Sequence, residues 1–170
     1  GDPETTLVNS EWGWRTHPIS GKEHLHDGID LHGVANSTNI IAAMGGEVIS
    51  VVNSCASFDS NGCGGGYGNH VIIQDTKGNT NLYAHMYQNS ILVEEGDTVS
   101  QGQVIGKVGS SGNSTGPHLH FTIRINGISV NPRDYIDPNN PRPTSLASLP
   151  FNESPFSKEE FVNRLTTYYS

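Results

Sequence analysis

Two histidines stand one residue apart in the stretch PHLHFTIRI, residues 117–125, which otherwise has the apolar character of a strand. Strand side chains alternate between two faces, so His118 and His120 share one face with Thr122 and Arg124. The opposite face is apolar, and we expect it to pack into the core: Leu119, Phe121, Ile123 and Ile125. The histidine face is therefore predicted to line a groove.

A second cluster lies in HLHDGIDLH, residues 24–32, where His26 and Asp30 are four positions apart. A separation of four returns a side chain to the same side of a strand, and nearly so in a helix, so both side chains can contact one ion. Two imidazole nitrogens and a carboxylate suit Zn²⁺, and three protein ligands leave a position open for water. The sequence predicts a catalytic zinc site formed by His26, Asp30 and either His118 or His120.

Short apolar runs separated by turn residues must position these side chains. They predict strands at residues 39–44, 47–52, 70–75, 80–86, 90–93, 103–109 and 117–125. The sequences TKGN at 76–79 and Asn126-Gly127 are typical of hairpin turns. No long amphipathic pattern interrupts residues 39–130. We therefore predict a mainly β fold, an antiparallel β-sandwich or open barrel with a zinc groove.

Length and charge limit the class of protein. A chain of 170 residues suits one domain with a genuine core. The formal net charge of −8 leaves no basic stripe, so we expect no nucleic-acid partner and no attraction to anionic membranes. No apolar run approaches the roughly 18 residues of a membrane span. The first residues lack the basic and apolar regions of a signal peptide, so we expect a mature or excised fragment.

The two cysteines, Cys55 and Cys63, bracket the short polar loop CASFDSNGC. We predict a disulfide between them, which implies an oxidising, extracytoplasmic setting. Two free thiols are the alternative. A zinc site at these cysteines is disfavoured because no second Cys or His pair lies nearby in the sequence.

The order HDGID, then LYAHM, then GPHLHF resembles the lysostaphin-type (LytM-domain) zinc metallopeptidases, which cleave peptide cross-links of bacterial peptidoglycan. The similarity extends through WRTHPISGKEHLHDGIDL, GGYGNHVIIQD and VEEGDTVSQGQVIGKVGSSGNSTGPHLHF. The resemblance implies that His26, Asp30 and His120 bind one Zn²⁺ per chain, while His85 and His118 stand beside the reacting water. The glutamate motif HExxH is absent, so imidazoles are the groups available for proton transfer.

The resemblance implies a zinc-dependent endopeptidase that hydrolyses peptide cross-links or bridges of peptidoglycan outside the bacterial cytoplasm. Its partner is then a peptidoglycan peptide, with no nucleic acid and no membrane span in this fragment, and further domains of a longer chain are expected. The loop at residues 54–69 is the expected specificity wall. The other histidines are expected to have structural or surface roles: His17, His24, His32 and His70.

Two other functions compete with this one. A catalytically silent cell-wall binding or regulatory scaffold can share the fold, but such relatives lose one or more of the five site positions, and this chain retains them all. A biotinyl or lipoyl carrier is suggested by VEEGDTVSQGQVIGKV, yet Gly45 and Gly46 stand where the modified lysine should be. The related D-Ala-D-Ala zinc peptidases need a later ExxH or ExxWH motif, which the sequence lacks.

The chain is predicted to divide into four parts. These are an N-terminal segment at 1–11, a peptidase domain at 12–136, a Pro/Ser/Asn-rich linker at 137–156 and a short helix or tail at 157–170. In the last part, Ser157 and Glu160 have capping-box spacing, which favours a helix.

Overall fold

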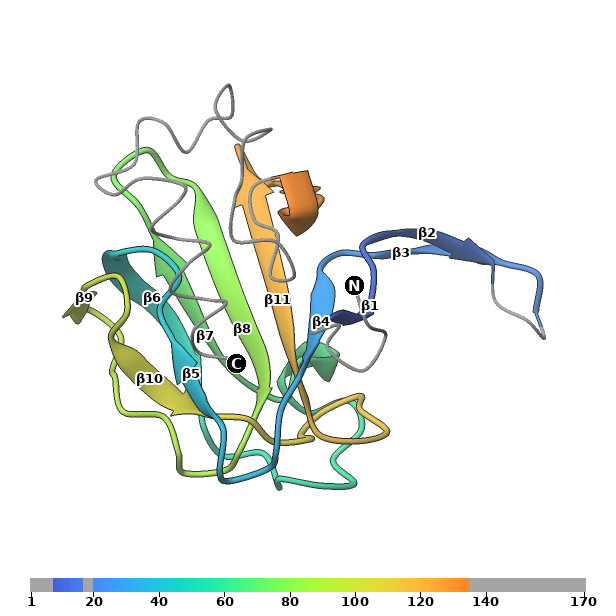
Figure 1. Ribbon diagram of the computed structural model, residues 1–170, viewed down its shortest axis with the longest axis horizontal. Coiled ribbons are helices and arrows are strands. Elements are labelled where there is room, and N and C mark those ends of the chain that lie inside the picture. Colours follow the sequence, from blue (N-terminus) through green and yellow to red (C-terminus); the bar gives the residue numbers. More distant parts are fainter. Residues whose placement is uncertain (1–7, 17–19, 135–170) are drawn as a thin grey trace.

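An eight-stranded antiparallel sheet dominates the computed structural model, which describes residues 8–16 and 20–134 (Figure 1). In sheet order, the strands are β1 (Val8–Ser10), β4 (Ile29–His32), β11 (His118–Ile125), β8 (Thr80–Met86), β7 (Asn69–Gln74), β6 (Gly46–Val52) and β9 (Thr98–Val99), and β12 (Ile128–Val130) pairs with β11. The sheet thus includes residues 8–10, which precede the region of family resemblance.

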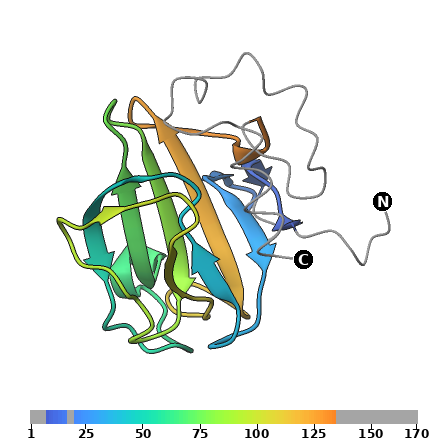
Figure 2. The same ribbon diagram turned by 60° about the vertical axis from the view of Figure 1, so that its left-hand side comes forward.

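Two strand pairs accompany this sheet. The pair β5 (Asn39–Ile41) and β10 (Val104–Lys107) lies against one face of the large sheet (Figure 2). Ile40 and Ile105 from this pair are fully buried in one cluster with Val71 and Phe121 from the large sheet. The hairpin of β2 (Gly13–Thr16) and β3 (Glu23–His26) projects from the body of the molecule (Figure 1). This arrangement is an open antiparallel sandwich, which confirms the predicted fold class.

Most of the predicted strands are present, as β5, β6, β7, β8, β10 and β11. The prediction of a strand at 90–93 is wrong. The Leu92 amide donates to the Ile105 carbonyl at 3.0 Å, and Val93 is buried, but the segment has no strand assignment. Its apolar residues belong to a loop that packs on the core. The predicted turn at Asn126-Gly127 is confirmed, because both residues have the positive φ that such a hairpin turn requires.

The two faces of β11 divide as predicted. Leu119, Phe121 and Ile123 are at most 1% exposed and belong to the core. Burial of side chains of this size contributes about 1.5–3 kcal/mol each to stability. The core therefore fixes the register of β11, and a slip of one residue would turn His118 and His120 into it.

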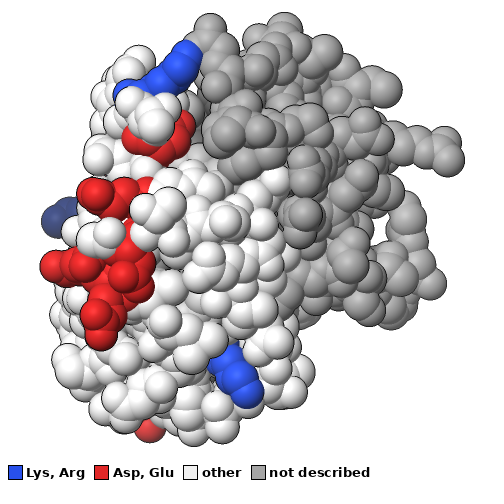
Figure 3. Space-filling model, turned by 90° about the vertical axis from the view of Figure 1, so that its left-hand side faces the viewer, with Lys and Arg blue, Asp and Glu red and all other residues white. Residues whose placement is uncertain are grey.

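Cys55 and Cys63 form the predicted disulfide, with 5.9 Å between their Cα atoms. Cys63 begins the short 3-10 helix η2 (Cys63–Gly66), and a second one, η3 (Pro132–Asp134), follows β12. None of the helices in the described ranges is long and apolar enough to cross a membrane. Acidic side chains gather on the side of the molecule that carries β9 (Figure 3).

The predicted linker at 137–156 and the predicted helix at 157–170 lie outside the described residues, as does His17.

Candidate active site

Three neighbouring strands of the large sheet, β4, β11 and β8, carry four of the five predicted site residues, and the fifth, His26, is the last residue of β3. In the sheet register, His120 of β11 lies opposite Asp30 of β4 on one side and Ala84 of β8 on the other. Ile29 and Leu31, on either side of Asp30, are fully buried, so strand alternation directs Asp30 away from the core. The site is therefore built on adjacent strands of the large sheet and on the end of the β2–β3 hairpin.

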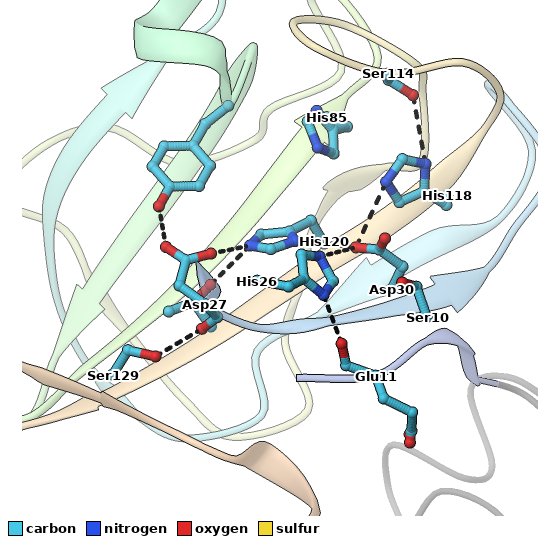
Figure 4. A network of polar contacts seen from close by, with 12 residues as sticks. Ser10, Glu11, His26, Asp27, Asp30, His85, Ser114, His118, His120 and Ser129 are labelled. Carbon is cyan, nitrogen blue, oxygen red and sulfur yellow. Dashed lines mark hydrogen bonds and ion pairs between the residues drawn. The ribbon is translucent and has the colours of Figure 1, made fainter. Parts of the chain in front are cut away.

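His26, Asp30 and His120 form a compact group of possible metal ligands (Figure 4). Asp30 Oδ1 lies 3.3 Å from His26 Nε2 and 2.9 Å from His120 Nδ1. Ligand atoms of a tetrahedral zinc site with bonds of about 2.0–2.1 Å are about 3.3 Å apart. One Asp and two His are also donors that Zn²⁺ accepts, so both the spacing and the chemistry of this group fit the ion.

The ring of His26 is oriented by the backbone. Its Nδ1 lies 2.7 Å from the carbonyl oxygen of Glu11 (Figure 4), which can only accept a hydrogen bond, and 3.0 Å from Arg15 Nη2, which can only donate one. The contact with the carbonyl is the shorter of the two and favours Nδ1 as the donor. In the neutral imidazole, Nε2 then carries the lone pair, and this is the nitrogen that faces Asp30.

His85 and His118 are oriented in the same way. His85 Nδ1 lies 2.7 Å from the carbonyl of Ser111, and His118 Nδ1 lies 2.8 Å from the carbonyl of Gly116. Both rings therefore donate through Nδ1 and keep Nε2 as the acceptor. The ring centroids are 4.7 Å apart, and His118 Nε2 is 3.6 Å from Asp30 Oδ1. Two proton acceptors thus lie beside the candidate metal ligands.

His85 has a backbone conformation that is uncommon for residues other than glycine. Its φ is 59°, in the left-handed region, although it lies within β8. Such a conformation costs on the order of 1–3 kcal/mol and is common at functional sites. Two hydrogen bonds hold it: the His85 amide donates to the Tyr67 carbonyl at 2.8 Å, and the Gly109 amide donates to the His85 carbonyl at 3.0 Å.

Burial also keeps His85 neutral. It lowers the pKa of His85 to about 4, with a further decrease from the neighbouring His118, although the bond to Ser111 opposes the change. His85 is 6% exposed. At neutral pH His85 is therefore a proton acceptor.

The five residues line a groove of about 390 Å³. Arg15, Gly65–Tyr67 and Asn113–Thr115 complete its lining. The last two segments lie side by side, because Asn113 Oδ1 accepts from the Gly62 amide at 2.7 Å and the Asn113 backbone amide donates to the Gly66 carbonyl at 2.8 Å. The loop at residues 54–69, which the sequence predicts to set specificity, thus contributes to the wall of the groove.

A polar network behind His120 was not predicted. His120 Nε2 lies 2.9 Å from Asp27 Oδ1 and 2.8 Å from Thr122 Oγ1. Arg124 Nη2 donates to Asp27 Oδ2 at 2.9 Å, and the Tyr67 hydroxyl donates to the same oxygen. The sequence feature that could have indicated this network is the position of Thr122 and Arg124 on the histidine face of β11, because an arginine there needs an acidic partner.

The network and the candidate ligands shift one another's pKa values. Burial raises the pKa of Asp27, but bonds from His120 and Tyr67 and the charge of Arg124 outweigh it and lower the value to about 2. Burial raises the pKa of Asp30, but hydrogen bonds from His120 and His26 outweigh it and lower the value far below its usual range. Burial lowers the pKa of His120, but hydrogen bonds to Asp27 and Asp30 outweigh it and raise the value.

The histidines for which the sequence predicted no chemistry have other surroundings. His24 and His32 are exposed. His70 is buried in β7, and its Nδ1 lies 2.9 Å from the Gly68 carbonyl. This contact agrees with the structural role expected for His70.

Comparison with known proteins places these residues in a family. The model of peptidase family M23 matches residues 24–132. The DD-carboxypeptidase/endopeptidase Mpg of Neisseria meningitidis serogroup B is 42% identical over 127 residues, which cover 75% of this chain and 26% of that protein. The murein hydrolase activator NlpD of Escherichia coli is 35% identical over 137 residues, or 78% of this chain and 33% of NlpD.

A solved structure agrees with these matches. The crystal structure of a zinc-containing peptidase from Vibrio cholerae superimposes with a TM-score of 0.59 at 28% identity, covering 74% of this chain and 35% of that one. This chain spans only about a quarter to a third of the three proteins. The matched region contains all five predicted site residues and confirms the resemblance to lysostaphin-type peptidases. The chain belongs to peptidase family M23.

Proposed function

We propose that the chain is a zinc-dependent endopeptidase that hydrolyses peptide cross-links or bridges of bacterial peptidoglycan. One observation carries the proposal: three donors suited to zinc and two oriented imidazoles meet in a single groove. The names of two relatives, an endopeptidase and a zinc-containing peptidase, support it.

The metal would be held by His26 Nε2, Asp30 and His120 Nδ1, the atoms that face one another in the structure. Zn²⁺ in a site with three protein ligands lowers the pKa of a coordinated water to about 7 and polarises a carbonyl oxygen. The unprotonated Nε2 atoms of His85 and His118 supply the proton acceptors that amide hydrolysis needs. After one accepts a proton from the attacking water, that imidazolium is an acid for the leaving amine.

We further propose an extracytoplasmic location with a peptidoglycan peptide as the partner. The disulfide between Cys55 and Cys63 supports an oxidising compartment, because such bonds rarely persist in a reducing one. Residues 12–136 are proposed as the peptidase domain of a longer protein, since the relatives extend well beyond the matched region.

A second function, activation of another wall hydrolase without catalysis, is favoured by the similarity to NlpD, a murein hydrolase activator. The two functions differ in what they require of the groove. An activator needs no proton acceptor there, whereas this chain holds both His85 and His118 in defined orientations.

Digestion of purified peptidoglycan tests the proposed function. The protein is incubated with walls from several bacteria of different bridge chemistry, and released peptide ends are identified by mass spectrometry. We expect new amino termini from one type of bond, loss of cleavage with a chelator, and recovery with zinc. A zinc-loaded protein that cleaves none of the walls but increases cleavage by an added hydrolase would support the activator instead.

Zinc affinity is expected to depend on pH, because protons and the metal compete for the same imidazole nitrogens. Since the pKa of His120 is raised above the usual value of about 6.5, affinity should still increase with pH above 6.5 and should fall steeply below it. Isothermal titration with zinc at pH 5.5 to 8 measures this. An affinity that is constant over the range would contradict imidazole ligation.

A further inference from the structure

We propose that Asp27 is a positioning residue that fixes the proton of His120 on Nε2 and thereby directs Nδ1 to the metal. The inference rests on the zinc site of the proposed function. It concerns a residue with no place among the candidate ligands or the proton acceptors of the groove.

The two ring nitrogens of His120 have different neighbours. Nδ1 lies 2.9 Å from Asp30 Oδ1, on the side of the candidate metal ligands, and Nε2 lies 2.9 Å from Asp27 Oδ1 (Figure 4). A carboxylate can only accept a hydrogen bond, so each of these contacts favours a proton on the nitrogen that faces it. A metal bound among the candidate ligands would replace the proton on Nδ1, while the contact with Asp27 would keep the other proton on Nε2.

His120 is held differently from the other three site histidines. The rings of His26, His85 and His118 each donate through Nδ1 to a backbone carbonyl. His120 instead uses Nδ1 toward the site and is held at Nε2 by side chains, Asp27 and Thr122. The Thr122 hydroxyl is both donor and acceptor, so it is compatible with either tautomer. Of the two partners of Nε2, Asp27 is the one that requires a proton there.

The carboxylate of Asp27 is itself fixed in place. Its Oδ2 accepts from Arg124 at 2.9 Å and from the Tyr67 hydroxyl, which leaves Oδ1 for His120. The next residue, Gly28, lets the backbone pass close to β11, because a Cβ there would lie only 2.3 Å from the Phe121 carbonyl oxygen. Tyr67 also belongs to the groove wall, so the network joins that wall to a candidate metal ligand.

The substitution Asp27→Asn tests the inference with almost no change in shape. The introduced amide has one oxygen for three donors, and its nitrogen cannot accept the His120 proton. If Arg124 and Tyr67 retain the oxygen, the amide nitrogen faces His120 and favours the proton on Nδ1, where the metal should bind. We expect zinc to bind about 10- to 100-fold more weakly, the usual effect of losing such a partner.

A matched control is Asp75→Asn. Asp75 is also partly buried, and its Oδ1 accepts from the Lys77 and Asn79 amides in the turn between β7 and β8. This change removes the same charge and should leave zinc affinity within about twofold of the wild type. Affinity is measured by competition with a chelating dye, and the thermal midpoint of the metal-free proteins reports any structural loss.

The tautomer is measured directly in the wild-type protein by long-range ¹H–¹⁵N NMR of its histidine rings. We expect the His120 proton on Nε2 in the zinc-loaded form, a result that does not depend on how well a variant folds. A proton on Nδ1 would overturn the inference. Equal zinc affinity of the wild type and Asp27→Asn would overturn it too, while leaving the proposed function intact. Failure of the wild type to bind zinc would overturn both.

Discussion

Replacement of His26, Asp30 or His120 by alanine is expected to remove bound zinc and peptidoglycan cleavage together. Each side chain supplies one of three donor atoms that lie within 4.8 Å of one another, and two protein ligands are fewer than the three that hold a catalytic zinc. Without the metal, neither an activated water nor a polarised carbonyl is available, so cleavage should fall to the background rate. Zinc content by mass spectrometry and release of wall peptides measure the two effects.

The controls are His24→Ala and His32→Ala, which change exposed histidines close in sequence to the candidate ligands. Both should retain one zinc per chain and near-normal cleavage. An Asp30→Ala protein with stoichiometric zinc and wild-type cleavage would contradict the assignment of the ligands.

Replacement of His85 or His118 by alanine should separate metal binding from catalysis. Both rings lie beside the candidate ligands and present Nε2 as an acceptor. Their loss should leave zinc content near normal and reduce the rate of cleavage by about 10²- to 10⁴-fold, the range for one general acid or base. Initial rates at saturating substrate, compared per bound zinc, measure this loss.

His85 needs a second variant because of its left-handed backbone. Asparagine adopts this conformation more readily than alanine, so His85→Asn should preserve the fold while removing the imidazole. Near wild-type cleavage by a zinc-loaded His85→Asn protein would exclude His85 from proton transfer. Loss of zinc in His118→Ala with retention in His120→Ala would mean that these two histidines have exchanged roles.

The longer strands and both hairpin turns were predictable because their signals are local. An apolar run between turn residues marks β8, alternation of apolar residues marks β11, and Asn126-Gly127 specifies its own turn. The short strands β1, β9 and β12 carry no such pattern. Each is two or three residues long and exists because a neighbouring strand supplies its hydrogen bonds, so it depends on tertiary contacts.

In the candidate site, too, the features set by local sequence patterns were predictable and those set by tertiary contacts were not. Spacing of four in the sequence and alternation in a strand placed His26, Asp30, His118 and His120 on common faces, and the family resemblance added His85. The partners that orient these rings could not be predicted in the same way. Three are backbone carbonyls, at Glu11, Ser111 and Gly116, which any residue type supplies.

The role of Asp27 could not be predicted from the sequence patterns either. It lies between His26 and Gly28, where strand alternation points it away from His26, and its partners Tyr67 and Arg124 are 40 and 97 residues away. The antiparallel pairing of β4 with β11 brings Arg124 near Asp27, and Tyr67 reaches it from the end of η2.

Anomalous diffraction at the zinc edge, from crystals of the zinc-loaded protein, would locate the metal among the candidate ligands. We expect one peak per chain, about 2.0–2.2 Å from His26 Nε2, an Asp30 carboxylate oxygen and His120 Nδ1. His85 and His118 should flank the ion without binding it. A peak bound by His118 in place of His120, or no peak among these residues in zinc-loaded crystals, would contradict the account.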